Sequence, residues 1–184
     1  MANPESTTGR LWTGKRVLVT GGSGFLGSHL VEHLVREGAT VAALARTEGK
    51  LAAITPPPDY LFLRCDLTDE EQARRAIEGF APQILYHFAS HPDGRESFEQ
   101  ANAAIRGNLL ATLNALEAFR RCGGQLFVYG DSCKVYGDCQ VPYRASMPLK
   151  PTSSYAISKA AGWQLCELYR RQYGLACVSV RPTL

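Results

Sequence analysis

The chain has 184 residues, of which 45% are hydrophobic and 20% are charged, and its formal net charge is +3. These values suit one globular domain with a sizeable core, and the absence of charge runs argues against nucleic acid or a membrane surface as a partner. The six cysteines form no C-x-x-C pair, and no histidine lies at ligand spacing from them, so we expect no metal site.

Residues 1–13 are predicted to form a flexible leader before a domain that covers residues 14–184. The leader is polar, contains Pro4 and Gly9, and lacks the apolar core of a signal peptide. No later stretch is long and apolar enough to span a membrane.

Three glycines follow the first predicted strand, an apolar run at residues 17–19. Gly21 suits a tight turn, Gly24 lets the backbone approach a pyrophosphate, and Gly27 allows close packing of helix on strand. The helix has an apolar face with helical spacing, which comprises Phe25, Leu26, Leu30, Leu34 and Val35. Its opening amides, near Ser23 to Leu26, lack intrahelical partners, so we expect them to hold the phosphates of a dinucleotide. The alternative is an ordinary strand-to-helix loop.

The residues at the end of the second predicted strand, residues 40–44, distinguish NAD from NADP in proteins that bind nicotinamide cofactors. An acidic residue there accepts from the ribose hydroxyl of NAD, whereas a basic one suits the extra phosphate of NADP. The chain reads Ala45-Arg46-Thr47 at this tip, with no carboxylate before Glu48. Our hypothesis is that Arg46 lies along the adenine ribose and favours NADP. If Arg46 is instead a solvated loop residue, NAD is the cofactor.

The third and fourth strands are predicted at residues 60–64 and 83–87, the third after a loop at Pro56 to Pro58. Asp66 follows the third strand, where a strand's carboxyl end meets the adenine pocket, and Thr68 is expected to cap a helix at residues 69–78. Phe88-Ala89-Ser90 follow the fourth strand. Ala89 and Ser90 are small, so a dinucleotide could lie close to the backbone there. The loop at residues 91–97 is of a kind that often carries substrate contacts.

A long helix is predicted at residues 98–121, ended by Gly123 and Gly124. Its buried side is expected to comprise Ile105, Leu109, Thr112, Leu113, Leu116 and Phe119. Asn108 falls within this pattern, and a buried amide must find partners. It is either a satisfied core group or a brace for active-site backbone.

The remaining predicted elements are a strand at residues 125–130, a helix at 155–173 that starts from Thr152-Ser153-Ser154, and a strand at 176–180. Alternating strands and helices predict an α/β fold, a Rossmann-type doubly wound parallel sheet with helices on both faces. Because such a domain usually continues after this strand, we expect the sequence to be truncated before a C-terminal substrate-binding part.

Tyr155 and Lys159 place a phenol and an ammonium at i and i+4, on one face of the last helix. A nearby cation favours the phenolate, so we expect the tyrosine pKa to fall from its usual value of about 10 towards the range of acid–base catalysis. Ser132, at the end of the fifth strand, can bind the same substrate oxygen. The alternative, an exposed helix pair, is weakened by the glycine turn and this serine upstream.

With these residues the chain resembles the extended short-chain dehydrogenases/reductases, which act largely on nucleotide sugars. The resemblance covers almost all of residues 15–183. Its motifs are T-G-x-x-G-F-x-G at residues 20–27, D-L-T-D at 66–69, H-F-A at 87–89, N-x-x-A-T at 108–112, S-x-x-V-Y-G at 132–137, Y-x-x-x-K at 155–159 and R-P at 181–182.

The resemblance implies roles for these residues. Tyr155 is the acid/base, Lys159 holds the nicotinamide ribose and tunes Tyr155, and Ser132 orients the reacting oxygen. The implied cofactor set comprises Gly21, Ser23, Gly24, Phe25, Leu26, Gly27, Arg46, Asp66, Leu67, Phe88, Ala89, Ser90, Asn108, Tyr155, Lys159 and Pro182. The implied reaction is hydride transfer from a sugar carbon to NAD or NADP through a keto-sugar intermediate.

The reaction and substrate are left open by the sequence. Related glucose 4,6-dehydratases place acidic residues after the catalytic Ser/Thr, whereas Cys133 and Lys134 stand here, which disfavours dehydration. The alternatives to an epimerase or dehydratase are an NADP-dependent reductase of another carbonyl and a non-catalytic dinucleotide sensor, which would not need Ser132, Tyr155 and Lys159. A dinucleotide site with unpatterned cysteines favours the cytoplasm. A homodimer through the helices that bear Asn108 and Tyr155 is implied by the resemblance alone.

Overall fold

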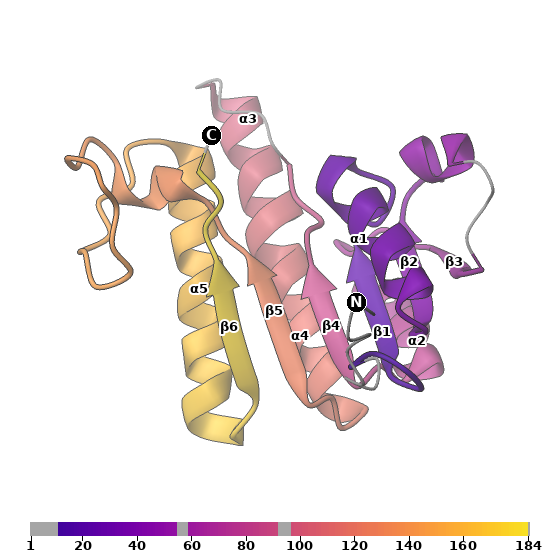
Figure 1. Ribbon diagram of the computed structural model, residues 1–184. Helices are drawn as coiled ribbons and strands as arrows, with labels where there is room; N and C mark the ends of the chain where they lie inside the picture. The colour runs from indigo at the N-terminus through magenta and orange to yellow at the C-terminus, as the bar shows by residue number, and fades with distance from the viewer. Residues whose placement is uncertain (1–10, 55–58, 92–96, 184) are drawn as a thin grey trace, which may run out of the picture.

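The computed structural model describes residues 11–54, 59–91 and 97–183. Six parallel strands form one sheet in the order β3-β2-β1-β4-β5-β6 (Figure 1). They are β1 (Arg16–Thr20), β2 (Thr40–Ala45), β3 (Leu61–Arg64), β4 (Ile84–His87), β5 (Leu126–Gly130) and β6 (Ala176–Val180). All six predicted strands are confirmed. The predicted loop at Pro56 to Pro58, residues 1–10 of the leader and residues 92–96 of the 91–97 loop lie outside the described residues.

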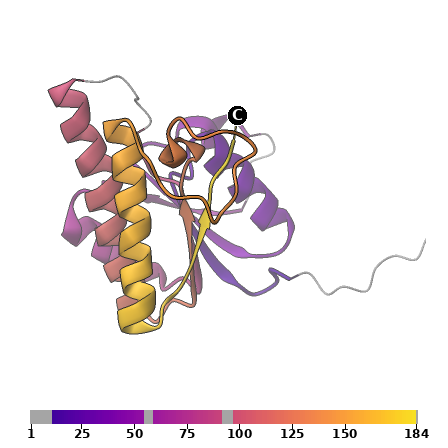
Figure 2. The same cartoon turned by 90° about the vertical axis from the view of Figure 1, so that its left-hand side faces the viewer.

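The helices lie on both faces of the sheet, so the predicted doubly wound α/β fold is confirmed. They are α1 (Phe25–Arg36), α2 (Glu70–Phe80), α3 (Phe98–Ala104), the π-helix η2 (Ile105–Leu110), α4 (Ala111–Arg121) and α5 (Ser154–Tyr173). Two 3-10 turns, η1 (Gly49–Ala53) and η3 (Cys133–Tyr136), follow β2 and β5. In Figure 2 the column of α3, η2 and α4 lies beside α5 on one face, while α1 covers the other. No helix among the described residues is both long and apolar enough to cross a membrane.

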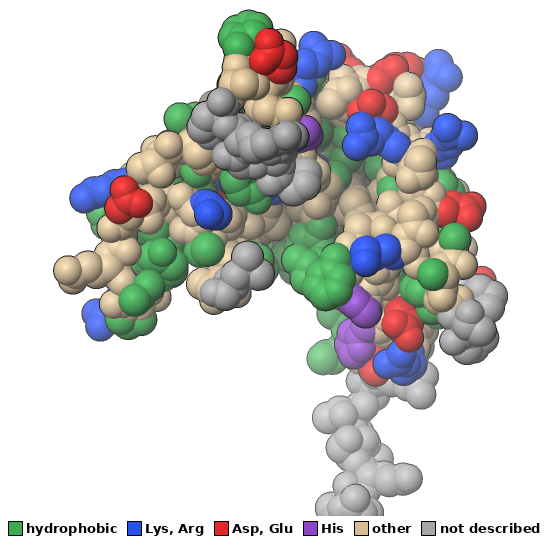
Figure 3. All heavy atoms as spheres, turned by 90° about the horizontal axis from the view of Figure 1, so that it is seen from above, with side chains coloured by type: hydrophobic (Ala, Val, Ile, Leu, Met, Phe, Trp, Pro, Cys, Tyr) green, Lys and Arg blue, Asp and Glu red, His purple; other side chains and the backbone are tan. Residues whose placement is uncertain are grey.

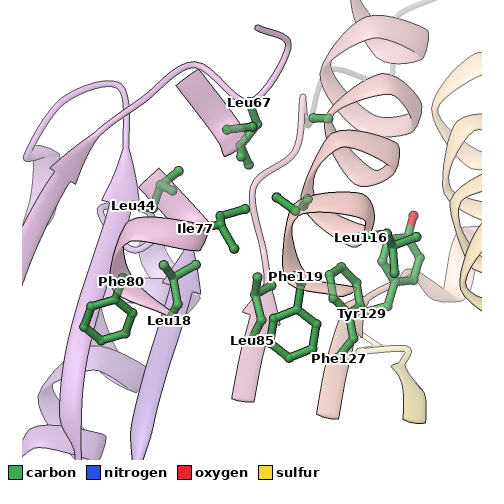
Figure 4. Packing of buried hydrophobic residues seen from close by; sticks show 14 of the residues in the cluster. Leu18, Leu44, Leu67, Ile77, Phe80, Leu85, Leu116, Phe119, Phe127 and Tyr129 are labelled. Carbon is green, nitrogen blue, oxygen red and sulfur yellow. The ribbon is translucent and has the colours of Figure 1, made fainter. Parts of the chain in front are cut away.

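Alternate strand residues enter two separate cores, as the period of a strand requires. Leu18, Leu85 and Phe127 are fully buried and pack with the helices α2, α4 and α5 (Figure 4). Val17 and Val19 are equally buried but belong to the core beneath α1. Because the strand order reverses between β1 and β4, the carboxyl ends of these strands form a crevice at one edge of the sheet.

The first turn of α1 is exposed, which corrects the predicted apolar face. Phe25 and Leu26 are 65% and 52% exposed, whereas Val31 and Leu34 are fully buried. The Phe25 ring lies edge-on to His29 at 5.2 Å between centroids and 5.6 Å from the Lys50 ammonium. The spacing did indicate a helix, but this turn lies past the end of the strand layer that buries the later turns.

The long predicted helix is interrupted by η2, and this corrects part of its predicted buried side. Thr112, Leu116 and Phe119 are buried as expected, but Ile105 and Leu113 are 41% and 38% exposed. A π turn inserts one extra residue per turn, so a single period of 3.6 residues does not place both ends of the helix on one face. The same turn places Asn108 inside the protein, with 1% of its surface exposed.

Side-chain caps fix the starts of two other helices. Asp69, not Thr68, caps α2, because Asp69 Oδ1 accepts from Gln72 N at 3.0 Å. Thr68 instead donates to Asp66 Oδ1 from both its amide and its hydroxyl, each at 2.9 Å. Ser153 caps α5 as the sequence indicated, with Ala156 N donating to Ser153 Oγ at 3.1 Å.

The phase of α4 is testable with two leucines three residues apart. Leu116→Ala is expected to lower the free energy of unfolding by about 2–5 kcal/mol, since it removes a fully buried side chain. Leu113→Ala is the matched control and should cost less than about 1 kcal/mol because its side chain is partly exposed. Urea denaturation measures both, and equal losses would contradict the assigned phase.

Candidate active site

The turn after β1 brings the start of α1 against the end of β4. Gly21 has a φ of +67°, and a side chain there would meet the backbone of Phe88 and Ala89, with its Cβ only 2.6 Å from Ala89 N. Gly27 lies directly over this turn, where any Cβ would collide with the Gly21 carbonyl oxygen. The tight turn and the close helix–strand packing predicted for these two glycines are therefore present. Gly24, the N-cap of α1, donates to the Gly21 carbonyl at 2.9 Å and so closes the turn.

A cleft of about 590 Å³ lies beside this turn, at the carboxyl edge of the sheet. It brings together most of the predicted cofactor residues: Gly21, Ser23, Gly24, Arg46, Asp66, Leu67, Phe88, Ala89 and Ser90. Figure 3 views this edge from above, with hydrophobic side chains exposed near its centre and Lys and Arg side chains interspersed with Asp and Glu on the half above α1 and β2. A cavity of this size, lined by glycine backbone and a helix N-terminus, fits a dinucleotide.

The cleft also has lining residues that the sequence analysis missed. Arg106 and Gly107 of η2 form part of its wall, as do Thr47, Thr68 and His91. The residues that follow a strand can be recognised in the sequence, but the helix residues that face a cleft cannot be identified until the rotation of the helix about its axis is known. Arg106 and Gly107 belong to such a helix.

Other predicted site residues do not line this cleft. Phe25 and Leu26 lie on the exposed first turn of α1. The Pro182 carbonyl accepts from Cys133 N at 3.4 Å and so lies beside the end of β5. Ser132, Tyr155 and Lys159 gather at that same end of the sheet.

Asn108 is a brace rather than an open cofactor ligand. Its Oδ1 accepts from His91 N at 2.6 Å, and its Nδ2 donates to the His91 carbonyl at 3.3 Å and to Ser158 Oγ at 2.8 Å. Ser158 Oγ in turn donates to the Tyr155 carbonyl at 2.7 Å. The side chain thus joins a wall residue of the cleft to the helix that carries Tyr155, which decides between the two roles expected for it.

His87 connects the glycine strand to this brace. Its ring is fully buried, with Nδ1 2.9 Å from Thr20 Oγ1 and Nε2 3.0 Å from Thr112 Oγ1. Thr112 Oγ1 donates to the Asn108 carbonyl at 2.6 Å, so its free lone pair accepts from His87 Nε2–H. Thr20 then donates to Nδ1, which fixes a neutral tautomer. Burial lowers the pKa of His87 to about 3, with the positive charge of Lys159 contributing.

Ser132 and Tyr155 lie close to each other at the end of β5. Ser132 caps η3, where its Oγ accepts from Lys134 N at 3.2 Å, and its side chain is near enough to the Tyr155 phenol to lower the pKa of that phenol. Both residues therefore present oxygens at one point, as a shared substrate atom requires.

The expected lowering of the Tyr155 pKa is wrong for this structure. Burial raises the Tyr155 pKa, and Asp131 and Cys133 raise it further, against the Ser132 hydrogen bond, which lowers it. Lys159, of which 3% is exposed, donates from its ammonium to the Gly130 carbonyl at 2.7 Å, and burial of the phenol is the largest influence on the Tyr155 pKa. Burial lowers the pKa of Lys159 itself to about 8, opposed by the charge of Asp131.

Helix α5 is held in this position by β5. The Tyr129 hydroxyl donates to the Lys159 carbonyl at 3.1 Å, while its ring lies 5.3 Å from the Lys159 ammonium. Gly162 permits the approach, since a Cβ there would collide with the Tyr129 hydroxyl.

A doubly wound sheet with a glycine turn, a cleft at the switch in strand order and a Ser–Tyr–Lys group at the end of the next strand is the architecture of a dinucleotide-binding domain. Comparison with known proteins gives the particular group. The family model described as the NAD dependent epimerase/dehydratase family matches residues 17–184, and the chain belongs to this family.

Named relatives include two kinds of nucleotide-sugar enzyme. The chain is 31% identical to the UDP-glucose 4-epimerase of Mycolicibacterium smegmatis, over 91% of this chain and 55% of the relative. It is also 31% identical to a probable dTDP-glucose 4,6-dehydratase of Sinorhizobium fredii, over 89% of this chain and 51% of the relative. The chain thus spans about half the length of the curated relatives it matches.

A solved structure with the same fold contains a cofactor. The UDP-glucose 4-epimerase of Thermus thermophilus, in complex with NAD, superposes with a TM-score of 0.83 and is 37% identical. The match covers 90% of this chain and 54% of that one.

The buried state of His87 predicts a specific pH dependence of stability. The unfolded chain protonates His87 below its usual pKa of about 6.5, whereas the folded chain excludes this proton down to about pH 3. The unfolded state then binds more protons, so stability falls as the pH falls.

The measurement compares the chain with His87→Gln, which keeps one donor and one acceptor without a titrating ring. Between about pH 6 and about pH 4, the unfolding free energy should fall by up to about 1.4 kcal/mol per pH unit more in the wild type than in the variant. Because the other three histidines are common to both proteins, parallel curves would rule out a buried neutral His87.

Proposed function

We propose that this chain forms the nicotinamide-dinucleotide-binding part of an enzyme that epimerises or dehydrates a nucleoside-diphosphate sugar. The observation that carries the proposal is the grouping of Ser132, Tyr155 and Lys159 at the end of β5, the neighbour of the strand β4 whose end lines the cleft, in a chain of this family. The names of the relatives, a UDP-glucose epimerase and a dTDP-glucose dehydratase, support this substrate class.

The chain's own residues divide the work. The backbone at Gly21 to Gly24 and the start of α1 bind the cofactor phosphates, and Arg46, Asp66 and residues 88–90 surround the adenosine half. When bound, oxidised nicotinamide accepts a hydride from the sugar, and its positive charge favours the phenolate form of Tyr155.

Tyr155 takes the hydroxyl proton of the sugar as the hydride leaves and returns a proton to the keto oxygen. Its raised pKa keeps it protonated without ligands, so it is an acid until positive charge arrives near the ring. Ser132 holds the reacting oxygen, and Lys159 supplies a buried ammonium beside it.

Epimerisation is favoured over dehydration by the residues after Ser132. Cys133 is half-buried, and Lys134 is exposed on η3, where the related dehydratases place acidic groups. A carboxylic acid pair is therefore missing from the positions that follow Ser132.

We propose NADP as the preferred cofactor. Arg46 is exposed at the tip of β2 and lines the cleft, and Arg106 lines it from η2. Among the described lining residues, Asp66 is the one carboxylate, so the cleft has a positive balance that suits an extra phosphate. The NAD bound in the Thermus thermophilus relative shows that this fold also takes the unphosphorylated cofactor.

We also propose a cytoplasmic homodimer, with residues 14–184 as the cofactor-binding domain and residues 1–13 as a leader. The six cysteines are free thiols, which suits a reducing compartment. Apolar side chains on the outer faces of the helices that bear Asn108 and Tyr155, among them Ile105, Leu113 and Ile157, are partly exposed and suit a helix–helix interface.

The role of Tyr155 is tested with Tyr155→Phe. Removing the hydroxyl deletes the proton acceptor and donor, so turnover of UDP- or dTDP-glucose should fall by about 10²–10⁴-fold, with cofactor affinity nearly unchanged. Product formation is followed by NMR, and cofactor binding by quenching of protein fluorescence. Tyr173→Phe, at the exposed end of the same helix, is the matched control. Full turnover by Tyr155→Phe would refute the assigned role.

The cofactor preference is tested with Arg46→Ala. Loss of a charge-assisted hydrogen bond to a phosphate should weaken NADPH binding by about 10–100-fold and leave NADH binding nearly unchanged. Arg75→Ala, an exposed arginine of α2 outside the cleft, serves as control. Tighter binding of NADH than NADPH by the unmodified chain would overturn the preference.

A further inference from the structure

Asp131 is a buried carboxylate beside the reacting residues, with no role in the proposed steps. It lies between β5 and Ser132, and its side chain is fully buried. Three donors reach it: Ser132 N to Oδ1 at 2.9 Å, and to Oδ2 both Ser179 Oγ at 2.9 Å and Arg181 Nε at 2.6 Å. A carboxylate is stable in such a place only because its oxygens are bonded and a cation is paired with it.

The partners of Asp131 join three segments around Ser132. Arg181 follows β6, and it also donates to the Tyr136 hydroxyl of η3 at 2.8 Å, with its guanidinium 5.2 Å from the centre of that ring. Ser132 immediately precedes η3 and caps it. Asp131 therefore fixes the backbone of Ser132 between the ends of β5 and β6.

The charge of Asp131 also acts on both proton-carrying residues. Around Tyr155 the polar and titratable groups are Ser132, Asp131 and Cys133, and Asp131 raises its pKa. Around Lys159 they are the Gly130 carbonyl, His87 and Asp131, and only Asp131 opposes the loss of its proton. One anion thus favours a neutral phenol and a charged ammonium together.

We propose that Asp131 is a positioning residue of the Ser132–Tyr155–Lys159 group. Its carboxylate holds the Ser132 backbone against Arg181 and supplies the negative charge that keeps Tyr155 a phenol and Lys159 an ammonium before ligands bind. The inference rests on the proposed function for its catalytic meaning, but the arrangement itself involves only this chain. Arg181 belongs to this arrangement because its positive charge partly cancels that of the Asp131 carboxylate, which weakens the effect of Asp131 on Lys159.

Opposite charge changes separate this role from a structural one. Asp131→Asn removes the anion and leaves Arg181 unbalanced, so the Lys159 pKa should fall. Arg181→Gln leaves Asp131 unbalanced, so the Lys159 pKa should rise. Ser179→Ala removes one hydrogen bond to Asp131 without changing any charge, and it should leave the Lys159 pKa near its original value. General loosening of the fold would move both charge variants the same way, towards an ordinary lysine.

The experiment is an NMR titration of Lys159 in the chain labelled with ¹³C at lysine Cε. The Lys159 resonance is assigned by its loss in Lys159→Met, and folding of each variant is checked by thermal unfolding. The unmodified chain should titrate near pH 8, Asp131→Asn lower by about one pH unit, and Arg181→Gln higher. In a second sample, labelled with ¹³C at tyrosine Cζ, the titration midpoint of Tyr155 should shift in the same direction as that of Lys159 in each charge variant.

An unchanged Lys159 midpoint in Asp131→Asn, or shifts of the same sign in both charge variants, overturns the proposal. If Asp131→Asn does not fold, Arg181→Gln is judged together with its thermal unfolding. A rise of the Lys159 midpoint in a variant that unfolds at the unmodified temperature supports the inference, and a fall, or a rise only in a variant that unfolds at a lower temperature, refutes it. The titration uses no substrate, so its failure is distinct from a failure to convert nucleotide sugars.

Discussion

The side chain of Asn108 joins the two parts of the site, since its carbonyl and amide groups bond both the His91 backbone and Ser158. His91 lines the cleft, and Ser158 bonds the carbonyl of Tyr155. Leaving a buried amide without partners costs free energy, so a shift of either the His91 backbone or Ser158 would be unfavourable for the Asn108 side chain that bonds both. The positions of the cleft wall and of the reacting phenol are therefore not independent.

This bridge exists because the long helix contains a π turn. A π turn is a rare feature inside an α-helix, and such turns occur frequently at functional sites. The chain of hydrogen bonds from Thr20 through His87 and Thr112 to the Asn108 carbonyl then ties this turn to the strand that begins the glycine turn. The neutral ring of His87 makes this series of hydrogen bonds possible, because it accepts from Thr20 at Nδ1 and donates to Thr112 from Nε2.

Much of the fold was predictable because it depends on local patterns. Short apolar runs gave the six strands, and Gly21 and Gly27 occupy positions where any side chain would collide with backbone. Residues 21–24 and 88–90 follow strands whose ends must meet at one edge of a parallel sheet, so most of the cleft could be located before its shape was known.

What could not be predicted depends on contacts between distant segments. The exposure of Ile105 follows from a π turn that periodicity does not reveal, and the exposure of Phe25 from where the sheet ends. The choice of Asp69 over Thr68 as a helix cap was decided by Asp66, which takes both donors of Thr68. The direction of the Tyr155 pKa needed a fact absent from the spacing, the burial of the phenol.

The site thus separates recognition from reactivity in physical terms. In the proposed function, cofactor binding depends on backbone groups at glycines, whereas Ser132, Tyr155 and Lys159 depend on a charge balance of Lys159, Asp131 and Arg181 in a buried place. A balance of that kind is sensitive to a single added charge, because low solvent access leaves little screening. In the proposed function, positive charge bound near Tyr155 would be such a change, and it would favour the phenolate form of Tyr155.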